Sequence, residues 1–514
     1  MLSGSDAADA ARRVRKVRYV LGEGQVLTTS EIRTFINNDA ASTRKQLAKV
    51  GLRYYEGKHD IKDYRIFYID GNGEVKEDKT KSNIRISHPF FTEIVDQIVP
   101  YILSGKDRLI KSDNPALQEQ LDAYFNNNDE FMAELADTIT GVQSKGFDWM
   151  FANKDEDGKT RFQWADCTGV VECEAKYTSD NRRYVIYYYE DKIDNEGNRI
   201  DNIRVYDDTS VWFFTCINGG EIKPDETVKP NPQPHSVFQM DGNGKLGGMG
   251  YGFIPFFRMD NNKKRVSALP PIKDLIDDYD LMNAGLSNNI QDTNEALYVV
   301  RGFQGDNLDE LMTNIKAKKH IGLDDDGGVD IQTVDIPVEA RKTKMEVDEK
   351  NIYRFGFALN TAGLKDTAAT TNLAIQSAYS LLELRAKKLE NRLKPFLRKL
   401  IDVVLKEINE ENGSGYTQND VYFCFEREIP TNAQENAQIE LVEAQRKQTE
   451  ITTILNLAGT IDDETKLQLI CEQLDIDYQD IKDKVPKPED DPTAAAQAAL
   501  GGIVPNEGNG DVIE

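Results

Sequence analysis

The stretch from Ile254 to Ile408 does most to limit what this chain can fold into. An apolar stripe at helical spacing follows Pro270-Pro271, and a stronger one runs along a predicted helix at Asn372–Ile408. Between them lies a predicted helix, Val338–Leu359, with little apolar surface of its own. Helices of this kind need a partner surface to complete their burial, so the pattern favours a subunit that packs against copies of itself. It indicates assembly rather than catalysis.

The predicted helix Val338–Leu359 has a sparse apolar stripe and charged residues on its other faces. So small an apolar face is insufficient for the core of a domain, which predicts a helix that bridges domains or packs between subunits. Oppositely charged residues four positions apart are expected to support it. The charged pairs are Lys342–Glu346, Lys344–Asp348 and Glu346–Lys350, and the stripe consists of Val338, Met345, Ile352, Phe355 and Leu359.

A small mixed unit is predicted between the first two of these helices. Its elements are a strand at Ala296–Val300, a helix at Asn307–Lys319 and two strands at His320–Leu323 and Val329–Val334, which give the order β-α-β-β. The acidic run Asp324–Asp326 then lies in a turn between the last two strands. Such a run is either a solvated turn, which is the simpler interpretation, or a place that attracts a divalent ion.

Elsewhere, helices and strands are predicted in separate blocks, the pattern of an α+β fold. Residues 30–55 look helical, Pro89 is placed as a first helical residue, and Pro395 is expected to kink the long helix. From Arg161 the period changes to that of strands, and residues 224–250 look like a long loop. Other predicted helices lie at 115–127, 129–151, 433–458, 463–474 and 478–484, and other predicted strands at 162–164, 170–174, 183–190, 203–206, 211–216 and 420–425.

The charge balance is strongly acidic: 63 basic and 88 acidic residues give a formal charge of −25. Tight binding of nucleic acid depends on neutralisation of phosphates by Lys and Arg, so this balance argues against it and suits a surface that DNA slides past. One basic spot stands out. Lys316, Lys318 and Lys319 end a predicted helix, with Arg301 nearby in sequence. These lysines either cap that helix or dock on an acidic partner or a DNA phosphate.

Motifs with a chemical role are weak in this sequence. Gly242–Gly250 lacks the lysine and the following helix of a phosphate loop, and Asn153–Trp164 ends in tryptophan where calcium needs a bidentate glutamate, so both are interpreted as turns. The five cysteines are scattered and the four histidines lie far apart. We therefore predict reduced thiols, no metal site, no cofactor and no enzyme. No apolar run suggests a membrane span or a signal for export.

Four strings of residues, taken in order, resemble the portal (head-to-tail connector) proteins of tailed bacteriophages, in the branch typical of Gram-positive siphophages. The resemblance covers roughly residues 30–480 and includes the helix Asn372–Ile408. Thr371-Asn372 departs from it, because many relatives carry Ser-Gly there. The strings are 54–61 (YYEGKHDI), 86–91 (ISHPFF), 254–262 (IPFFRMDNN) and 269–279 (LPPIKDLIDDY).

The resemblance implies an α+β, multi-domain portal fold with wing, stem, clip and crown regions, assembled as a ring. The implied regions are a flexible N-terminal segment (1–29), the wing with helices and then a β-rich part (30–265), a stem helix (266–295), the β-α-β-β clip (296–336), a second stem helix (337–359), a tunnel loop (360–371), the wing again with the long kinked helix and a strand (372–431), crown helices (432–485) and a disordered tail (486–514).

Particular residues take roles from the same resemblance. The tunnel loop is expected to line the DNA channel, the second stem helix to pack against neighbouring subunits, and the clip to dock partners. The residues implied are, for the tunnel loop, Asn360, Thr361, Lys365, Asp366, Thr367, Thr370 and Thr371; for stem packing, Met345, Glu346, Lys350 and Ile352; and for the clip, Arg301, Lys316, Lys318 and Lys319.

The resemblance also implies partners and a location. The chain is expected to form a homo-oligomeric ring, a dodecamer, at one vertex of the virion capsid, assembled in the cytoplasm of the host bacterium. Double-stranded DNA would pass through it; the terminase large subunit and then the head-tail adaptor would dock on it, beside major capsid and scaffolding proteins, with no membrane. The alternatives are another self-assembling virion structural or scaffold protein, and a metal-dependent enzyme that uses the acidic turns.

Overall fold

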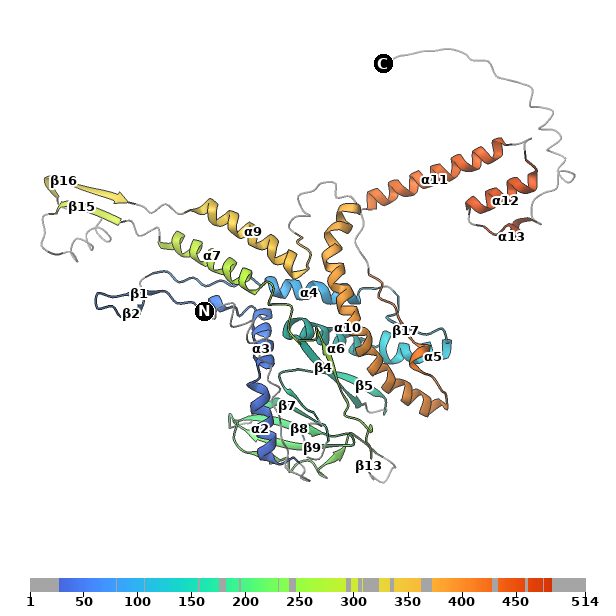
Figure 1. Ribbon diagram of the computed structural model, residues 1–514, viewed down its shortest axis with the longest axis horizontal. Helices are drawn as coiled ribbons and strands as arrows, with labels where there is room; N and C mark the ends of the chain where they lie inside the picture. Colours follow the sequence, from blue (N-terminus) through green and yellow to red (C-terminus); the bar gives the residue numbers. More distant parts are fainter. Residues whose placement is uncertain are drawn as a thin grey trace, which may run out of the picture. The chain divides into compact units, whose positions relative to one another are not determined.

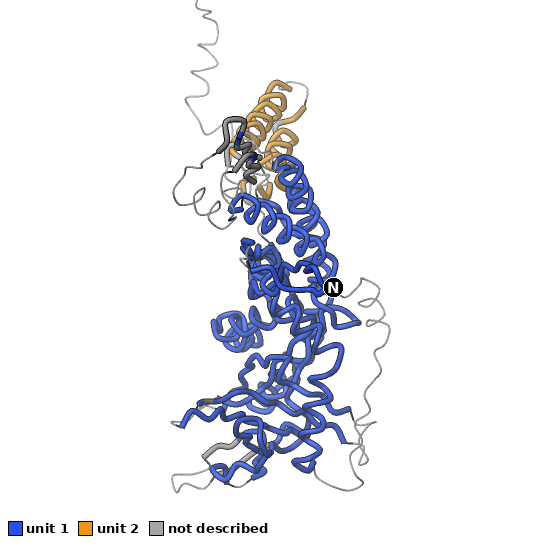
Figure 2. The backbone as a smooth tube through the Cα atoms, turned by 90° about the vertical axis from the view of Figure 1, so that its left-hand side faces the viewer, with its two compact units in different colours: residues 1–368, 376–429 blue, residues 369–375, 430–514 orange. Residues whose placement is uncertain are grey.

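The chain divides into two compact units, shown in different colours in Figure 2: residues 1–368 with 376–429, and residues 369–375 with 430–514. Each unit is a separate body with its own packing. The computed structural model describes residues 27–79, 81–105, 107–155, 158–174, 182–193, 196–229, 231–239, 246–292, 297–303, 307, 323–332, 337–361, 372–427, 433–457, 461–474 and 476–482.

The first unit begins with two helices, α2 (Thr29–Ala40) and α3 (Thr43–Tyr55), where the sequence predicted one helical stretch. The break follows from Ser42, whose extended backbone and side chain cap the start of α3. Thr28 caps α2 in the same way, and Leu27 is buried beneath the β-rich part. The flexible N-terminal segment predicted at 1–29 therefore extends too far, because its last residues are held in place; residues 1–26 lie outside the described residues.

A layer of helices follows: α4 (Phe90–Leu103), α5 (Pro115–Leu121) with a π-helical turn to Asn126, and α6 (Asp129–Lys145). Pro89 is the N-cap of α4 rather than its first residue. The helix predicted to reach residue 151 ends at Lys145, because Gly146 adopts a left-handed backbone with φ +99° that ends helices. A Cβ there would lie 2.6 Å from the carbonyl oxygen of Arg265, so this position requires glycine.

The β-rich part contains two main antiparallel sheets. In the first, β4 (Phe147–Lys154) lies between β14 (Phe256–Asp260) and β5 (Thr160–Ala165). The second sheet has the order β10-β9-β8-β7-β6, with β11 also on β9. Its strands are β6 (Val170–Cys173), β7 (Tyr184–Ile193), β8 (Arg199–Tyr206), β9 (Ser210–Ile217), β10 (Ile222–Pro224) and β11 (Gln233–Pro234).

Residues 224–250 are more ordered than the predicted long loop. They contain β11 and an antiparallel pair of strands, β12 (Ser236–Gln239) and β13 (Leu246–Met249). The prediction was wrong because Pro, Gly and Asn dominate the composition there, and the strand residues between them are few. Residues 240–245 lie outside the described residues.

The largest buried cluster is formed by the helical layer with α10 (Asn372–Asn412), a helix of 41 residues that contains Pro395. Figure 1 shows α10 changing direction part-way along, as expected where a proline interrupts the backbone ladder. A short two-stranded pair, β17 (Tyr422–Phe423) with β3 (Ile110–Lys111), follows the helix. The strand predicted at 420–425 is thus shorter than expected, because Gln418–Asp420 forms a 3-10 turn.

Two further helices, α7 (Lys273–Asp292) and α9 (Val338–Gly356), run side by side and lead to the strand pair β15 (Leu297–Phe303) and β16 (Leu323–Gln332), as Figure 1 shows. Two separate strands were predicted at 320–323 and 329–334, but their described residues, 323 and 329–332, belong to one strand, β16. The residues of the acidic run Asp324–Asp326 therefore belong to a strand instead of a turn. The predicted helix at 307–319 lies outside the described residues except for Asn307.

The second unit contains α11 (Ala433–Asn456), α12 (Asp463–Leu474) and α13 (Tyr478–Lys482), which confirms three predicted helices with small changes at their ends. The tail from residue 486 lies outside the described residues. Among the described helices, none is both long and apolar enough to cross a membrane.

Candidate ring-packing and docking site

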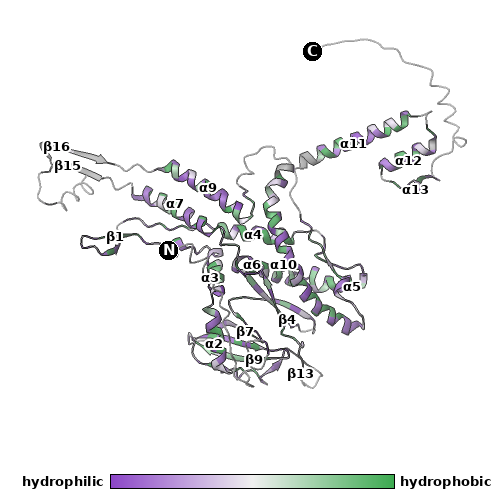
Figure 3. Cartoon of the chain, in the orientation of Figure 1, coloured by the Kyte–Doolittle hydropathy of each residue, from purple (hydrophilic) through white to green (hydrophobic). Residues whose placement is uncertain are grey.

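The α7–α9 pair is attached to the first unit through one buried cluster. Side chains of four helices meet there: Tyr54 of α3, Ile94 of α4, Ile276 of α7 and Ile352 of α9. All four side chains are fully buried. The pair therefore has a firm apolar attachment at one end, while many of its other residues are hydrophilic, as the purple segments along both helices in Figure 3 show.

The apolar stripe predicted on α9 divides into two. Ile352 is buried and Met345 is half-buried, but Val338 and Phe355 are exposed. The buried positions run from Asp348 through Ile352 to Gly356, at spacings of four residues. Consecutive residues of a helix are rotated by about 100° about its axis. Phe355 is therefore rotated away from Gly356, the last residue of the buried stripe.

Gly356 lets α9 approach α4 closely, because a Cβ at that position would lie 2.8 Å from Cδ1 of Ile94. The helix then ends at Phe357, whose backbone is left-handed with φ +52°. Lys388 of α10 places its ammonium 4.3 Å from the centre of the Phe357 ring, a cation–π contact. The end of α9 is thus fixed from two sides.

Charged residues of α9 link it to α7. Lys344 donates to Asp348 one turn later, as predicted, and also to Asp278 of α7. Glu346 and Lys350, two of the predicted packing residues, are exposed on α9. Surface pairs of this kind contribute at most about 1 kcal/mol each, so they add little to the stability of the helix.

The strongest polar arrangement in this region is one that the sequence interpretation missed. It consists of Asp280 of α7 with His59 and His88, all brought together at the attached end of the pair. His59 Nδ1 lies 2.6 Å from Asp280 Oδ2, and His88 Nδ1 lies 2.7 Å from Oδ1. The backbone N–H of His88 donates to the same Oδ1 at 2.9 Å. Asp280 and His59 are fully buried.

The second ring nitrogen of each histidine has a different partner. His59 Nε2 faces the carbonyl oxygen of Tyr54 at 3.2 Å. The Nε2 of His88 faces the side-chain amide of Asn283 at 3.1 Å. The Tyr54 ring stacks on His59 with ring centres 4.6 Å apart.

Burial alone would raise the pKa of Asp280, but the hydrogen bonds from His59 and His88 outweigh it and hold the pKa below its usual value. A second link lies beside it, where the hydroxyl of Tyr54 donates to Asp277 and Lys273 bridges Asp277 and Asp60. α7 is thereby joined to the segments after α3 and before α4 by charged groups as well as by apolar packing.

A signal for this arrangement does exist in the sequence. The buried positions of α7 are Ile276, Asp280, Ala284 and Asn288, spaced four residues apart, so two polar residues occupy its inner face. Buried polar side chains need partners. The sequence did not give those partners, because the histidines are 221 and 192 positions away from Asp280.

The start of the predicted tunnel loop is anchored. Gln97 of α4 both donates to the carbonyl of Leu359 at 2.9 Å and accepts from its N–H at 3.0 Å. Asn360 donates to Glu349 at 3.3 Å, and Thr361 is exposed. The remaining predicted loop residues lie outside the described residues: Lys365, Asp366, Thr367, Thr370 and Thr371.

Arg385 of α10 is buried next to this anchor. It donates to Gln143 at 2.8 Å, to the carbonyl of Ile94 at 2.8 Å and to that of Gly356 at 3.4 Å. Burial lowers the pKa of Arg385 to about 10. Its fixed fork of donors joins α4, α6, α9 and α10 at the point where the chain leaves α9.

The predicted docking residues of the clip are described only in part. Arg301 is exposed on β15, opposite Gly328 of β16. Lys316, Lys318 and Lys319 lie outside the described residues.

Two groups of acidic and sulfur side chains have the spacing of metal ligands. In one, Asp148, Asp166 and Cys167 meet, but Lys145 already lies 2.8 Å from Asp148 and 3.1 Å from Asp166. This ammonium occupies the place that a cation would take. The other consists of Asp107, Cys424 and Glu426.

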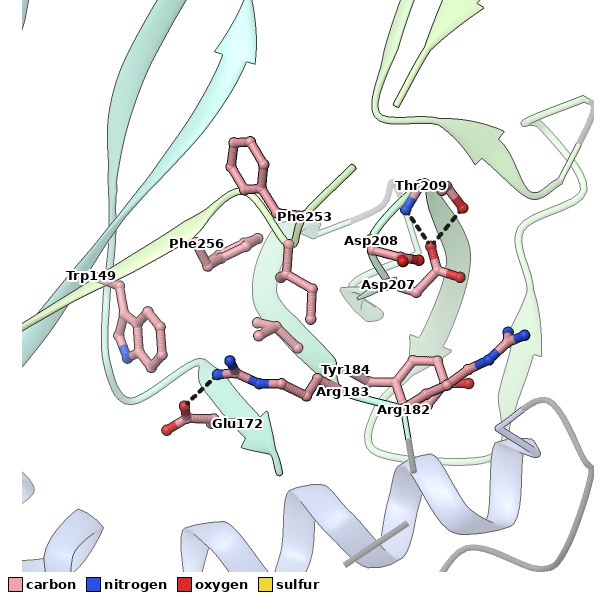
Figure 4. A pocket seen from close by; sticks show the side chains of 12 residues that line it. Trp149, Glu172, Arg182, Arg183, Tyr184, Asp207, Asp208, Thr209, Phe253 and Phe256 are labelled. Carbon is pink, nitrogen blue, oxygen red and sulfur yellow. Dashed lines mark hydrogen bonds and ion pairs between the residues drawn. The ribbon is translucent and has the colours of Figure 1, made fainter. Parts of the chain in front are cut away.

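A pocket of about 650 Å³ opens in the β-rich part (Figure 4), between Trp149 and Phe256 on one side and Asp207 on the other. Glu172 at its edge pairs with Arg183 at 3.3 Å and also with Arg258. Asp207 accepts from the backbone and hydroxyl of Thr209. These charged groups are thus paired with other groups of the sheet. Such pairing is typical of a structural network rather than of a reactive centre.

Comparison with known families gives the context for these elements. The sequence matches the family described as phage portal protein, SPP1 Gp6-like, over residues 35–479. The chain belongs to this phage portal family. The family is structural, and membership assigns the chain a portal function at the capsid vertex of a phage particle.

Two curated relatives have the same assignment. The portal protein of Bacillus phage SPP1 is 28% identical over 351 residues, which cover 68% of this chain and 67% of the relative. The portal protein of Clostridium phage phiCD119 is 26% identical over 396 residues, which cover 73% of this chain and 82% of the relative. The predicted resemblance to portal proteins of Gram-positive siphophages is thereby confirmed.

Solved structures show a more distant likeness. The chain aligns with the neck of a native GTA particle computed with C12 symmetry, with a TM-score of 0.38, 11% identity, and coverage of 74% of this chain and 89% of the other. The neck of an empty GTA particle computed with C6 symmetry gives a TM-score of 0.35, 10% identity, and coverage of 74% and 90%. Scores of this size are too low to assign partners.

We predict that Asp280→Asn destabilises the first unit. Loss of the carboxylate removes the charged acceptor that faces two histidine rings and one backbone N–H in a buried site, which costs about 3–5 kcal/mol of unfolding free energy. Urea titration of the full chain measures the change. Asp278→Asn is the matched control, since Asp278 forms an exposed pair with Lys344 and should cost at most about 1 kcal/mol. Equal losses in the two variants would contradict the role of Asp280.

The same carboxylate gives a pH dependence. Because the pKa of Asp280 is lowered on folding, its contribution to stability is complete above the ordinary aspartate value of about 3.9. That contribution is lost as the pH falls through the lower value of the folded chain. Asp280→Asn should therefore lose less stability than the unmodified chain on acidification below pH 4, and parallel curves would contradict this assignment.

Proposed function

We propose that the chain forms a ring of about twelve subunits through which double-stranded DNA is packaged and later ejected. In this proposal α7 and α9 are the stem helices, β15 and β16 belong to the clip, residues 360–371 form the tunnel loop, and α11 to α13 form the crown. The observation that supports it most is the α7–α9 pair, which is anchored at one end by Asp280 and carries many hydrophilic residues, in a chain of the portal family.

The charge of the chain suits a DNA conduit. At −25 per copy, about twelve copies would carry roughly −300, which repels a polyanion from the channel walls instead of retaining it. A surface rich in paired charges also keeps neighbouring subunits soluble until they meet. DNA would then move past the ring with little friction from phosphate contacts.

The proposed partners follow the order of a phage life cycle. The terminase large subunit docks on the clip during packaging, and the head-tail adaptor takes the same place afterwards. Major capsid and scaffolding proteins surround the ring at the vertex, and assembly takes place in the cytoplasm of the host bacterium. The clip is proposed as the docking surface because β15 exposes Arg301 on an acidic chain, with three lysines following in sequence.

The ring itself is tested by native mass spectrometry and by images of the purified full-length chain. A closed particle of about twelve copies is expected, since head-to-tail contacts that close produce rings. A monomer or an open filament under all assembly conditions would contradict the proposal. An open filament would favour a different self-assembling virion protein.

Shortening of the tunnel loop tests the channel. Removal of several residues between Asn360 and Thr371 should leave ring assembly intact, because the anchor at Leu359 and Gln97 precedes the loop. DNA packaging, measured as nuclease-protected genome in assembled heads, should fall. The matched control removes the same number of residues from the tail 486–514. Normal packaging with the shortened loop would exclude its role in the channel.

Charge reversal tests the clip. Changing Lys316, Lys318 and Lys319 to Glu should weaken binding of the terminase or adaptor about tenfold or more, because three exposed contacts together supply about 1.4 kcal/mol or more. Ring mass should be unchanged. Binding affinity measured on assembled rings provides the readout.

A matched reversal at three exposed lysines of α10, Lys387, Lys399 and Lys406, changes the net charge equally in a different place. It should leave partner binding unchanged. If both variants bind partners normally, the lysines of the clip only cap their helix. If both lose affinity equally, net charge and not the clip determines docking.

A further inference from the structure

A small hairpin near the start of the first unit exposes an unusual amount of apolar surface. It consists of β1 (Phe67–Ile69) and β2 (Val75–Glu77), and every residue of both strands is exposed. The side chains of Phe67, Ile69 and Val75 are 60%, 71% and 68% exposed. An isolated two-stranded hairpin is marginally stable at best in water, so exposed apolar residues on one indicate a missing cover.

The register places these residues on one face. Phe67 lies opposite Glu77, Tyr68 opposite Lys76, and Ile69 opposite Val75. Side chains alternate between the faces of a strand pair, so Phe67, Ile69 and Val75 share one face with Glu77 at its edge, and Tyr68 and Lys76 share the other. We call the first the hairpin's apolar face.

The shape of the hairpin is well specified despite its exposure. Asp70 accepts from the backbone N–H groups of Asn72 and Glu74, both at 2.9 Å, and from the ammonium of Lys76 at 2.5 Å. Gly73 supplies the left-handed backbone that the turn requires. The chain therefore holds the apolar face in a definite form without covering it.

The hairpin is tied to the flank of α7. After β2 the chain returns along that helix, where the N–H of Ser82 donates to Asp292 at 3.2 Å and the N–H of Ile84 donates to Asn288 at 2.6 Å. Figure 1 draws α7 between the hairpin and α9. The hairpin thus belongs to the α7 flank of the helix pair.

Helix α9 has an uncovered stripe of its own. Val347 and Phe355 of α9 are 48% and 45% exposed and lie two turns apart, with Asn351 between them. This outer stripe is displaced by one residue from the buried stripe that ends at Gly356. Lys350 and Arg354, both exposed, flank it.

Charge favours contact between these two surfaces. Residues 67–78 contain four acidic residues and one lysine, a net charge of −3, and α7 contains five aspartates and one lysine, a net charge of −4. α9 contains five basic and four acidic residues, a net charge of +1. An acidic hairpin is therefore repelled by an α7 surface and attracted by the α9 surface near Lys350 and Arg354.

We propose that the hairpin's apolar face of one subunit covers the outer stripe of α9 in the next subunit of the ring. Because the hairpin and the outer stripe are different surfaces of the chain, each copy can contact one neighbour through its hairpin and the other through its stripe. Such a head-to-tail contact is the kind that closes rings. The inference rests on the proposed ring and adds to it a specific contact between subunits.

The test uses the full-length chain with paired cysteines, Ile69→Cys with Val347→Cys, joined by a short bis-maleimide on assembled rings. A head-to-tail contact links each copy to two neighbours, so a denaturing gel should show a ladder of multimers up to the size of the ring. The matched control pairs Lys76→Cys, on the other face of the hairpin, with Val347→Cys, and the ladder should be lost. Each single-cysteine variant measures the background from native thiols.

A second pair, Val75→Cys with Phe355→Cys, probes the same two surfaces. It replaces the first pair if the Ile69→Cys, Val347→Cys variant does not assemble into rings. Rings of native mass without a ladder from either pair would overturn the hairpin contact while the ring stands. Products that stop at dimers would overturn it as well, as would cross-links formed only to co-expressed capsid protein. If the unmodified chain forms no ring in native mass spectrometry, the proposed function fails first and this contact fails with it.

Discussion

The carboxylate of Asp280 is the interaction on which the α7–α9 pair depends. It lies on the inner face of α7 and accepts from His59 and His88, which follow α3 and precede α4 respectively. A buried carboxylate that lacked these donors would cost several kcal/mol, so α7 can pack only where both histidines are in place. The polar contact therefore fixes the position of α7, and apolar packing around Tyr54 supplies most of the burial.

α9 depends on that attachment and uses its surface in two ways. The inner stripe through Ile352 completes the buried cluster, and Gly356 allows close packing against Ile94. The outer stripe through Val347 and Phe355 has no cover within the described part of the chain. Two short apolar stripes on different faces leave only a weak apolar periodicity in the sequence of α9, although each stripe has a surface to pack against. This division is what a subunit with neighbours on both sides requires.

Most of the helices could be predicted from periodicity, because burial of one face leaves a clear spacing. α12 was predicted with its observed limits, and α10 with its interior Pro395. Errors occurred where one residue decides the backbone, as at Ser42 and Gly146, or where a strand is rich in polar residues and glycine, as in β16. In the candidate site, Ile352 is buried in the cluster of its own chain while Phe355 of the same predicted stripe is exposed, since a sparse stripe fits two helical faces equally well. The predicted role of Ile352 in packing between subunits stays a prediction.

The sequence by itself determined that this chain is an acidic, α+β portal protein with long helices, because composition, spacing and ordered motifs are local properties of a chain. Tertiary structure alone decided that two distant histidines share Asp280, that Arg385 fixes the end of α9, and that the hairpin face near Ile69 stays uncovered. These contacts join segments up to hundreds of positions apart. No periodicity records such pairings, since each residue type is common and only the folded chain brings the partners within hydrogen-bonding or van der Waals distance.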